Sequence, residues 1–425
     1  MGELSDVSDR LSETVQPGET GTHMHIGDTP DEAAFRVEAR TWLGQHARLK
    51  SEGAGELGEH DLAGHIQKCR DWQRVLFENG WAGITWPKQF GGRGASAIQA
   101  AIFAEEMAAF DVSTGAFAVS IGMVGPTLIA HGTPDQQERH LAPILRGDEV
   151  WCQLFSEPGS GSDLASLGTR AVRDGDEWVV NGQKVWTSFG QFADYAILLA
   201  RTDTDAPKHA GITYFILDMK TPGLDIRPIT QITGVQHFNE VFLSDVRIPD
   251  ANVLGDVDGG WKVAQTTLSN ERSHIGSGGG GWTVQQLADI ARERGLADDP
   301  RVRQGLAQAH IRSENLRFLG FRMRTAMSQK RMPGPEMLTL KLAYANHWRL
   351  TADLAAEIVG PGFTLWGEDA PHDNQWGQHL LSQFAIRIGG GTDEIQRNII
   401  AERGLGLPRE PQPDKDRPWS ALTRA

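Results

Sequence analysis

The sequence predicts an α+β protein whose structured part runs in the order helices, a small all-β domain, and helices again. Helix signals fill the first 150 residues and return after residue 259, while the segment between them holds short runs rich in β-branched and aromatic residues. The 425 residues suffice for several such units around shared cores. The expected parts are a disordered tail over 1–27, helices over 28–150, the β domain over 151–258, helices over 259–409 and a tail over 410–425.

Start and stop signals justify the first helical part. Residues 1–27 combine charges, Ser, Thr and Gly with few large apolar residues, a composition that does not bury a core. Thr29-Pro30 is a helix start, because Thr caps the free N–H groups and Pro fits the first turn. Asn79-Gly80 ends a helix, and Thr133-Pro134 begins another. The proline- and glycine-rich segment 86–92 is expected to be a loop.

Turn signals and apolar runs justify the β domain. Strand-like runs cover 195–200, 212–217 and 240–243. Asn181-Gly182 lies between two further strand-like runs, and this dipeptide is the strongest short signal for a β-hairpin. We therefore expect a tight turn there, preceded by another turn at Asp174-Gly175.

The second helical part begins after Gly259-Gly260 and reaches Arg403, where Gly404 supplies a stop signal. Pro361, Pro371 and the glycines at 389–391 interrupt it.

Composition excludes several classes of function. The formal net charge of −14 argues against nucleic acid as a partner, because phosphate backbones need a basic surface. No apolar run is long enough to span a membrane, and the first 30 residues lack a secretory apolar segment. Two cysteines give no disulfide framework, which favours a reducing, cytoplasmic location. The histidines show no metal-ligand spacing, so we expect no metal.

Four stretches carry a family resemblance. Residues 83–92 read GITWPKQFGG, 156–163 read SEPGSGSD, 181–188 read NGQKVWTS, and 391–398 read GTDEIQRN. In this order they resemble the acyl-CoA dehydrogenase family, and the resemblance covers roughly residues 30–409. It implies an N-terminal α-helical domain, a middle β-barrel and a C-terminal four-helix bundle.

The resemblance also implies a reaction. It would be the FAD-dependent α,β-dehydrogenation of an acyl-CoA thioester in fatty acid or steroid degradation, with an electron-transfer flavoprotein or an equivalent acceptor. Other flavin chemistry on the same fold, as an oxidase or monooxygenase, remains an alternative, because a fold does not fix a function. So does a subunit that only completes another chain's flavin site.

The flavin residues follow by position in the matched motifs. The glycines and serines of 156–163 would let the backbone approach a ligand and donate hydrogen bonds to it. Trp186 would cover the isoalloxazine ring, although a core aromatic is the alternative. The resemblance implies flavin contacts for Gln153, Phe155, Ser156, Gly161, Ser162, Trp186, Thr187, Ser188, Thr392 and Glu394. Ser162 would also lie near the CoA arm, and Glu394 would meet a ribose hydroxyl or point away.

The catalytic base is the most distinctive assignment. Many family members place a Glu immediately before the Gly-Thr of the fourth motif, but that position is Gly390 here. A second family solution places the Glu on the first long helix of the C-terminal bundle, where this chain has Glu271. The resemblance thus implies that Glu271 is the base, that Arg272 lies near the thioester, and that the Gly390 N–H still binds the thioester oxygen.

One half of the expected FAD site is missing from the sequence. The family binds the FAD diphosphate across a subunit interface, with an Arg-x-x-Phe-Gly stretch and a later Gln. The corresponding stretch, 290–296, reads IARERGL, and Ala356 stands at the Gln position. Two arrangements remain open: an α₂β₂ oligomer with a related subunit that carries the arginine, or a homo-oligomer (dimer or tetramer) in which Arg292, Arg294 or another arginine reaches the diphosphate.

Overall fold

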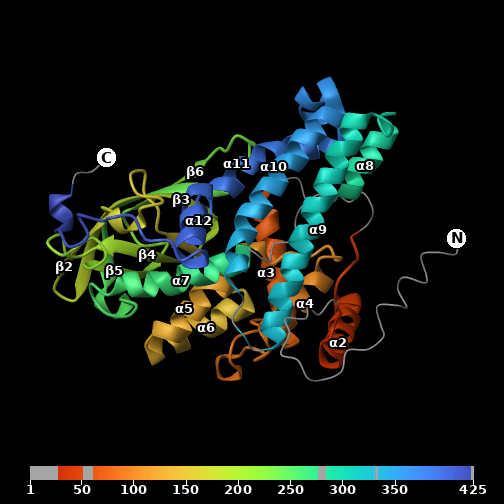
Figure 1. Ribbon diagram of the computed structural model, residues 1–425. Helices are drawn as coiled ribbons and strands as arrows, with labels where there is room; N and C mark the ends of the chain where they lie inside the picture. Colours follow the sequence, from red (N-terminus) through yellow and green to blue (C-terminus); the bar gives the residue numbers. More distant parts are fainter. Residues whose placement is uncertain (1–26, 51–60, 276–283, 330, 332–333, 423–425) are drawn as a thin grey trace.

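The three-part organisation predicted from the sequence is present in the computed structural model, which describes residues 27–50, 61–275, 284–329, 331 and 334–422 (Figure 1). Helices form the first and third parts, and a curled sheet forms the middle part. The expected tail over 1–27 lies outside the described residues except for Gly27. None of the helices in the described ranges combines the length and the apolar character needed to cross a membrane.

Side-chain caps fix where the first helices begin. Thr29, Ser96 and Thr133 each accept a hydrogen bond from the third residue of the helix, whose Glu or Gln side chain bonds back to the cap. The signals at Thr29 and Thr133 are thus confirmed. The α-helices of this part are α2 Pro30–His46, α3 Leu62–Glu78, α4 Ala97–Met107, α5 Gly125–His131 and α6 Pro134–Arg146.

The segment 86–92, expected to be a loop, contains a short 3-10 helix, Lys88–Phe90. It packs into the helices of this part through Trp86. Its indole is buried and donates a hydrogen bond to the Ile121 carbonyl at 3.1 Å. Ile121 belongs to a single π-helical turn, Ser120–Val124, directly before α5. A Cβ on Gly125 would lie 1.8 Å from the Trp86 ring, so only glycine allows this contact.

The middle domain is one seven-stranded sheet. The strand order is β1-β4-β2-β3-β7-β6, with β5 also paired to β4. β1 and β2 run parallel to β4, and the other pairs are antiparallel. The strands are β1 Trp151–Leu154, β2 Arg170–Asp174, β3 Glu177–Ser188, β4 Tyr195–Arg201, β5 Ile212–Asp218, β6 Leu224–Ile229 and β7 Phe238–Pro249.

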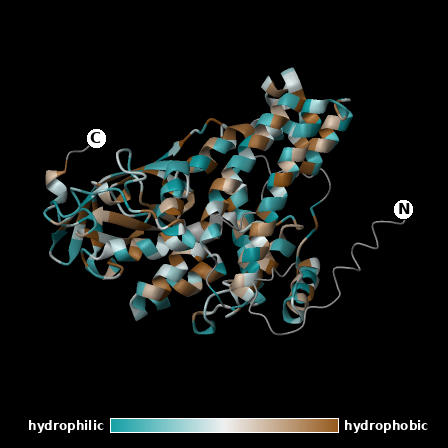
Figure 2. Cartoon of the chain, viewed as in Figure 1, coloured by the Kyte–Doolittle hydropathy of each residue, from teal (hydrophilic) through white to brown (hydrophobic). Residues whose placement is uncertain are grey.

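Strand β4 is apolar on both faces because it lies between two cores. Ala196 and Leu198 pack inside the curl of the sheet, whereas Ile197 and Leu199 pack against the helices. The strands of this domain accordingly carry hydrophobic residues while the loops around them are hydrophilic (Figure 2). The sheet is thereby fixed to the helices that approach its outer face.

The expected hairpin at Asn181-Gly182 is wrong. β3 continues straight through this dipeptide, and the strand register against β7 shifts there by a bulge. Asn181 bridges to Asp245 on β7, accepting from its N–H at 2.9 Å and donating to its carboxylate at 3.0 Å. A Cβ on Gly182 would lie 2.4 Å from Thr169 Oγ1. The dipeptide therefore serves a bulge, and the turn is at Gly175, with φ +68°.

The third part is helical and joins the other two. Helix α7 packs on β5 and α5 and lies between them in Figure 1. Helices α9, α10 and α11 pack side by side, with α8 against α9 and α10. The bounds are α7 Gly260–Ile275, α8 Val284–Glu293, α9 Pro300–Ser328, α10 Leu340–Val359, α11 Gln375–Ile388 and α12 Asp393–Ile399.

Candidate active site

A buried ion pair anchors the loop of the second motif. Lys184 on β3 is fully buried, and its Nζ lies 2.8 Å from Glu157 Oε1 and 3.0 Å from the Phe155 carbonyl. Glu157 also accepts hydrogen bonds from the N–H groups of Gly168 and Thr169. Burial alone would raise the pKa of Glu157, but Lys184 and these donors outweigh it and hold that pKa below its usual value. The N-terminal end of the loop after Phe155 is therefore held in place by a buried ion pair.

The loop itself presents its tip to solvent. Ser160 is buried and donates to the Asp163 carbonyl at 2.6 Å, which closes the loop on itself. Gly161 and Ser162 are exposed, and a Cβ on Gly161 would meet nothing within 4 Å. Ser156 is half-buried at the N-terminal end of the loop. The predicted donors at Gly161 and Ser162 are thus accessible to a ligand.

Trp186 is not a core residue. It sits at a bulge of β3, with φ +62°, and its side chain is 58 % exposed. Such a backbone conformation is uncommon for a bulky residue and often marks a functional position. The bulge turns the indole outward, and its ring packs edge-on against Phe238, with ring centroids 5.9 Å apart. This exposure excludes the alternative of a core aromatic.

The neighbouring groups fit a flat ring with polar edges. Thr187 is buried, and its Oγ1 has no hydrogen-bond partner among the described residues, so a ligand atom could satisfy it. Ser188 is half-buried beside it. On β1, Gln153 is half-buried, and Phe155 is buried just beyond the strand end. An exposed indole next to a buried unpaired hydroxyl is the arrangement that an isoalloxazine would need.

Glu271 lies in the last third of α7, and it is not an exposed helical charge. The residue is half-buried, and its Oε2 is shielded from solvent. Shielding a carboxylate from water makes it a stronger base. The side chain of Arg272 lies outside the part of the structure that is described, so its predicted role stays a prediction.

Three buried hydroxyls hold α7 one turn before Glu271. Thr267 Oγ1 lies 3.0 Å from Thr127 Oγ1 on α5 and 3.0 Å from the Tyr214 hydroxyl on β5. All three residues are fully buried. Because residues four apart share a helix face, Glu271 projects from the same side of α7 as Thr267. Its backbone position is therefore set by all three parts of the fold.

The same cluster links Glu271, the candidate base, to the predicted flavin wall. Tyr214 packs edge-on against Phe155, with ring centroids 5.8 Å apart. Phe155 leads into the 156–163 loop, and Tyr214 bonds to Thr267. Burial raises the pKa of the Tyr214 phenol, so it stays protonated and can donate. The sequence alone did not single out Tyr214 or Thr267, since a hydroxyl in an apolar run carries no signal of its partner.

We expect Thr267→Val to slow flavin reduction by about 10-fold with little change in KM, because it removes the shared hydroxyl at nearly constant shape. Thr267→Ser keeps the hydroxyl and should retain the rate. Anaerobic single-turnover reduction of the flavin by an acyl-CoA measures the effect. Equal rates for the Val and Ser variants would show that the hydroxyl does not position the base.

Gly390 lies in a rigid turn between α11 and α12. Its φ is +65°, and that of Gly391 is +91°, a region that favours glycine. Lys341 Nζ holds the Gly391 carbonyl at 2.8 Å, and Gln396 Nε2 holds the Gly390 carbonyl at 3.1 Å. Among the described residues, no acceptor takes the Gly390 N–H. The turn thus offers a fixed backbone donor without a side chain.

The two remaining candidate flavin residues, Thr392 and Glu394, have different surroundings in the structure. Thr392 caps α12 through the Ile395 N–H. Glu394 is 76 % exposed and pairs with Arg397, so its carboxylate points to solvent. The buried acid of this motif is instead Asp393, which pairs with Arg387 at 2.7 Å. Both interpretations of Glu394, contact with a ribose hydroxyl or a side chain that points away, stay predictions.

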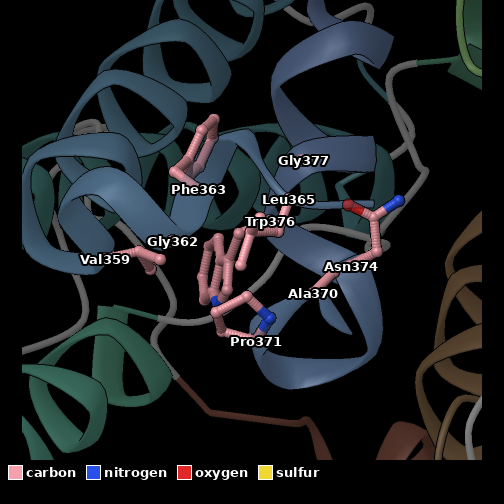
Figure 3. Close-up of a pocket in the computed structure, with 9 residues that line it drawn as sticks. All are labelled: Val359, Gly362, Phe363, Leu365, Ala370, Pro371, Asn374, Trp376 and Gly377. Atoms are coloured by element: carbon pink, nitrogen blue, oxygen red, sulfur yellow. The ribbon is translucent and has the colours of Figure 1, made fainter. Parts of the chain in front are cut away.

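A small hollow in the third part is not the candidate site. Its volume is about 10 Å³, which is room for a single water and no more (Figure 3). It is lined by Val359, Gly362, Phe363, Leu365, Ala370, Pro371, Asn374, Trp376 and Gly377. None of the predicted site residues lines it. No group of metal-ligating side chains occurs among the described residues.

Comparisons with known proteins agree with this architecture. The N-terminal, middle and C-terminal domains of acyl-CoA dehydrogenase match residues 29–148, 152–246 and 258–405. Acyl-CoA dehydrogenase IpdE1 of Mycobacterium tuberculosis is 40 % identical over 395 residues, which are 89 % of this chain and 99 % of that protein.

Two solved structures resemble the whole fold. One is named "Tcur3481-Tcur3483 steroid ACAD", with a TM-score of 0.78 and 32 % identity over 91 % of this chain and all of that chain. The other is the ChsE4–ChsE5 complex of Mycobacterium tuberculosis, with a TM-score of 0.74 and 31 % identity over the same shares. With three matching domains in order and a 40 % identical relative along nearly its full length, the chain belongs to the acyl-CoA dehydrogenase family.

Proposed function

We propose that this acyl-CoA dehydrogenase uses FAD and that Glu271 removes the α proton of the acyl thioester. The observation that carries the proposal is the half-buried carboxylate of Glu271, with one oxygen shielded from solvent, one turn beyond the Thr267 hydroxyl cluster. A base in this setting is partly desolvated and its backbone is fixed in place, which favours the abstraction of a weakly acidic proton.

The cofactor would lie between Trp186 and the 156–163 loop, with Thr187, Ser188 and Thr392 near its ring. When bound, FAD supplies the acceptor for the hydride that leaves the β carbon. The half-buried Ser156 and the exposed Ser162 would donate hydrogen bonds to the polar edges of the ligands. Trp186 would exclude water from one face of the ring.

Two groups of this chain would handle the charge that develops on the substrate. The Glu271 carboxylate takes the α proton, and the negative charge then moves toward the thioester oxygen. The Gly390 N–H would donate a hydrogen bond to that oxygen, and its turn is held by Lys341 and Gln396, so it needs no rearrangement. In this proposal the base lies on α7, and the backbone donor lies in the turn before α12.

Anaerobic titration of the purified protein with a panel of acyl-CoA thioesters tests the function. Bleaching of the flavin absorbance identifies the substrates that are dehydrogenated. We expect bulky, cyclic acyl groups to be accepted, because Gly390 adds no side chain beside the reacting carbons. Oxygen consumption coupled to turnover would instead indicate oxidase or monooxygenase chemistry, and the absence of bleaching with every thioester would contradict the proposal.

The FAD diphosphate would need a partner subunit. In this chain Arg292 pairs with Asp289, and Ala356 offers no hydrogen-bonding side chain. A diphosphate buried without cationic partners is costly, so an arginine must come from elsewhere. Two structural relatives are named as pairs of different proteins, which supports an α₂β₂ assembly with a related subunit. A homo-oligomer with Arg294 or another arginine in that role is the competing arrangement.

We expect this chain, purified alone, to contain well under one FAD per chain, and co-expression with a related arginine-bearing subunit to restore the flavin. The flavin absorbance per protein and the mass from light scattering measure both quantities. A stable homodimer or homotetramer that carries one FAD per chain would rule out an obligatory second subunit.

A further inference from the structure

The last described residues form a strap that returns to the middle domain. The match to the family's C-terminal domain ends at residue 405, and the chain then continues past α12 to the sheet. Its final turn, Trp419–Ala421, lies against the loop that joins β4 to β5, at the edge of the sheet domain (Figure 1). We define the strap as residues 408–422. The sequence predicts only a tail over 410–425, because one Trp among charges and prolines carries no packing signal.

The strap is docked by backbone hydrogen bonds and one buried side chain. The N–H groups of Trp419 and Ser420 donate to the carbonyls of Ala206 and Thr204, both at 2.9 Å. Trp419 is 7 % exposed, and its ring lies over the Arg201 guanidinium, 4.9 Å from centroid to Cζ. This is close enough for a cation–π contact at a desolvated cation.

Arg201, at the end of β4, connects the strap to the loop of the candidate site. Its Nη2 donates to the Ala165 carbonyl at 2.6 Å, and its Nη1 donates to the Lys208 carbonyl at 3.0 Å. Trp419 Nε1 also donates to the Ser166 carbonyl at 3.4 Å. The guanidinium is buried, so the indole that covers it also keeps water from these carbonyls.

Both loops that Arg201 holds meet at the end of the second motif. Lys208 Nζ pairs with Asp163 at 2.8 Å, and Ser166 Oγ donates to the same carboxylate at 2.6 Å. Asp163 directly follows Gly161 and Ser162, the exposed tip of the ligand loop. Arg201 and Lys208 therefore fix the C-terminal end of this loop, and Lys184 fixes its N-terminal end.

We propose that the strap is a positioning element: through Trp419 and Arg201 it immobilises the 160–167 segment and so pre-orders Gly161 and Ser162 for the flavin and the CoA arm. The identity of the ligands in this inference rests on the proposed function. The clamp, by which we mean the contacts of Trp419 and Arg201 with the 160–167 segment, does not depend on it. Ordering the loop before binding lowers the entropy cost of binding, so the strap acts on affinity and leaves the proton transfer at Glu271 unchanged.

The test compares a chain that ends at Leu407 with a matched control that ends at Leu422, each purified as the holoprotein with any subunit it requires. In the shorter chain, amide hydrogen exchange over 164–169 should be at least about 10-fold faster, since Ser166 and Leu167 donate within the clamped turn. We expect KM for the acyl-CoA to rise about 5- to 20-fold, FAD to be lost more readily, and kcat to stay within about 3-fold.

Point variants of Trp419 distinguish the effect of its side chain from the effect of the backbone hydrogen bonds of the strap. Trp419→Ala should reproduce the loosened loop, and Trp419→Phe should restore most of the protection, because a ring still covers Arg201. Unchanged exchange over 164–169 in the shorter chain would overturn the clamp. Faster exchange with unchanged KM and FAD retention would overturn its role in binding. Failure of the proposed function looks different, because the full-length holoprotein would then not be reduced by any acyl-CoA.

Discussion

Glu271→Gln is expected to bind FAD and acyl-CoA like the unchanged protein and to reduce the flavin about 10²- to 10⁴-fold more slowly. The substitution keeps the size and the hydrogen-bonding shape of the side chain and removes the proton acceptor. Binding should survive because the Thr267 cluster, the Gly390 turn and the 156–163 loop do not depend on this charge. Stopped-flow reduction under anaerobic conditions measures the chemical step, and a thioester that perturbs the flavin spectrum measures binding.

Glu138→Gln on α6 is a suitable control, since Glu138 is an exposed helical glutamate outside the four motifs. It should reduce the flavin at the unchanged rate. A wild-type rate for Glu271→Gln would show that another group is the base. Gly390→Glu is expected to restore little of the rate, because a side chain at φ +65° strains the backbone of this turn.

Local signals predicted those parts of the fold that local chemistry decides. Thr29 and Thr133 were identifiable as caps, because a cap satisfies N–H groups only a few residues away. The hairpin predicted at Asn181-Gly182 is wrong because its outcome is decided by a contact that is distant in the sequence. Whether such a dipeptide turns the chain or bulges within a strand depends on its partner, and Asp245 on β7, which completes the bulge, lies more than sixty residues away.

The candidate site divides in the same way. The assignment of the base to Glu271 stays a prediction, which rests on the register of the family resemblance and on the missing side chain at Gly390. The groups that hold the site could not be predicted. In the sequence, Lys184 has the pattern of an ordinary polar residue on a half-exposed strand. Its burial against Glu157 becomes visible only in the folded structure. The sequence predicts Trp419 only as part of a tail. Its contact with Arg201 depends on how the C-terminal segment folds back onto the middle domain.

Lys184→Met is expected to have the largest effect on stability, lowering the free energy of unfolding by about 3–5 kcal/mol. Lys184 is fully buried, and its partner Glu157 is nearly so, with 12 % of its side chain exposed. Methionine fills the space of the aliphatic stem but leaves the carboxylate without its cation. Urea unfolding of the apoprotein followed by tryptophan fluorescence measures the change, since Trp178 lies in the core of the same domain.

The effect should depend on pH in a defined direction. In the unchanged protein the pKa of Glu157 lies below its usual value, so the pair stabilises the fold at neutral pH and loses this contribution as the pH falls toward the lowered pKa. In Lys184→Met, burial remains without the cation and raises that pKa, so acid neutralises a destabilising charge. The difference between the two proteins should therefore shrink as the pH falls from 7 towards the usual pKa of Glu, about 4.3.

The double variant Glu157→Gln/Lys184→Met decides whether the lost stability comes from the uncompensated charge. Glutamine removes the charge, and its carbonyl can still accept from the Gly168 or Thr169 N–H. The double variant should therefore recover most of the loss, and its stability should no longer show the pH dependence that Glu157 gives to the unchanged protein and to Lys184→Met. If it is as unstable as Lys184→Met alone, packing of the lysine stem, and not the buried charge, is what holds the N-terminal end of the loop.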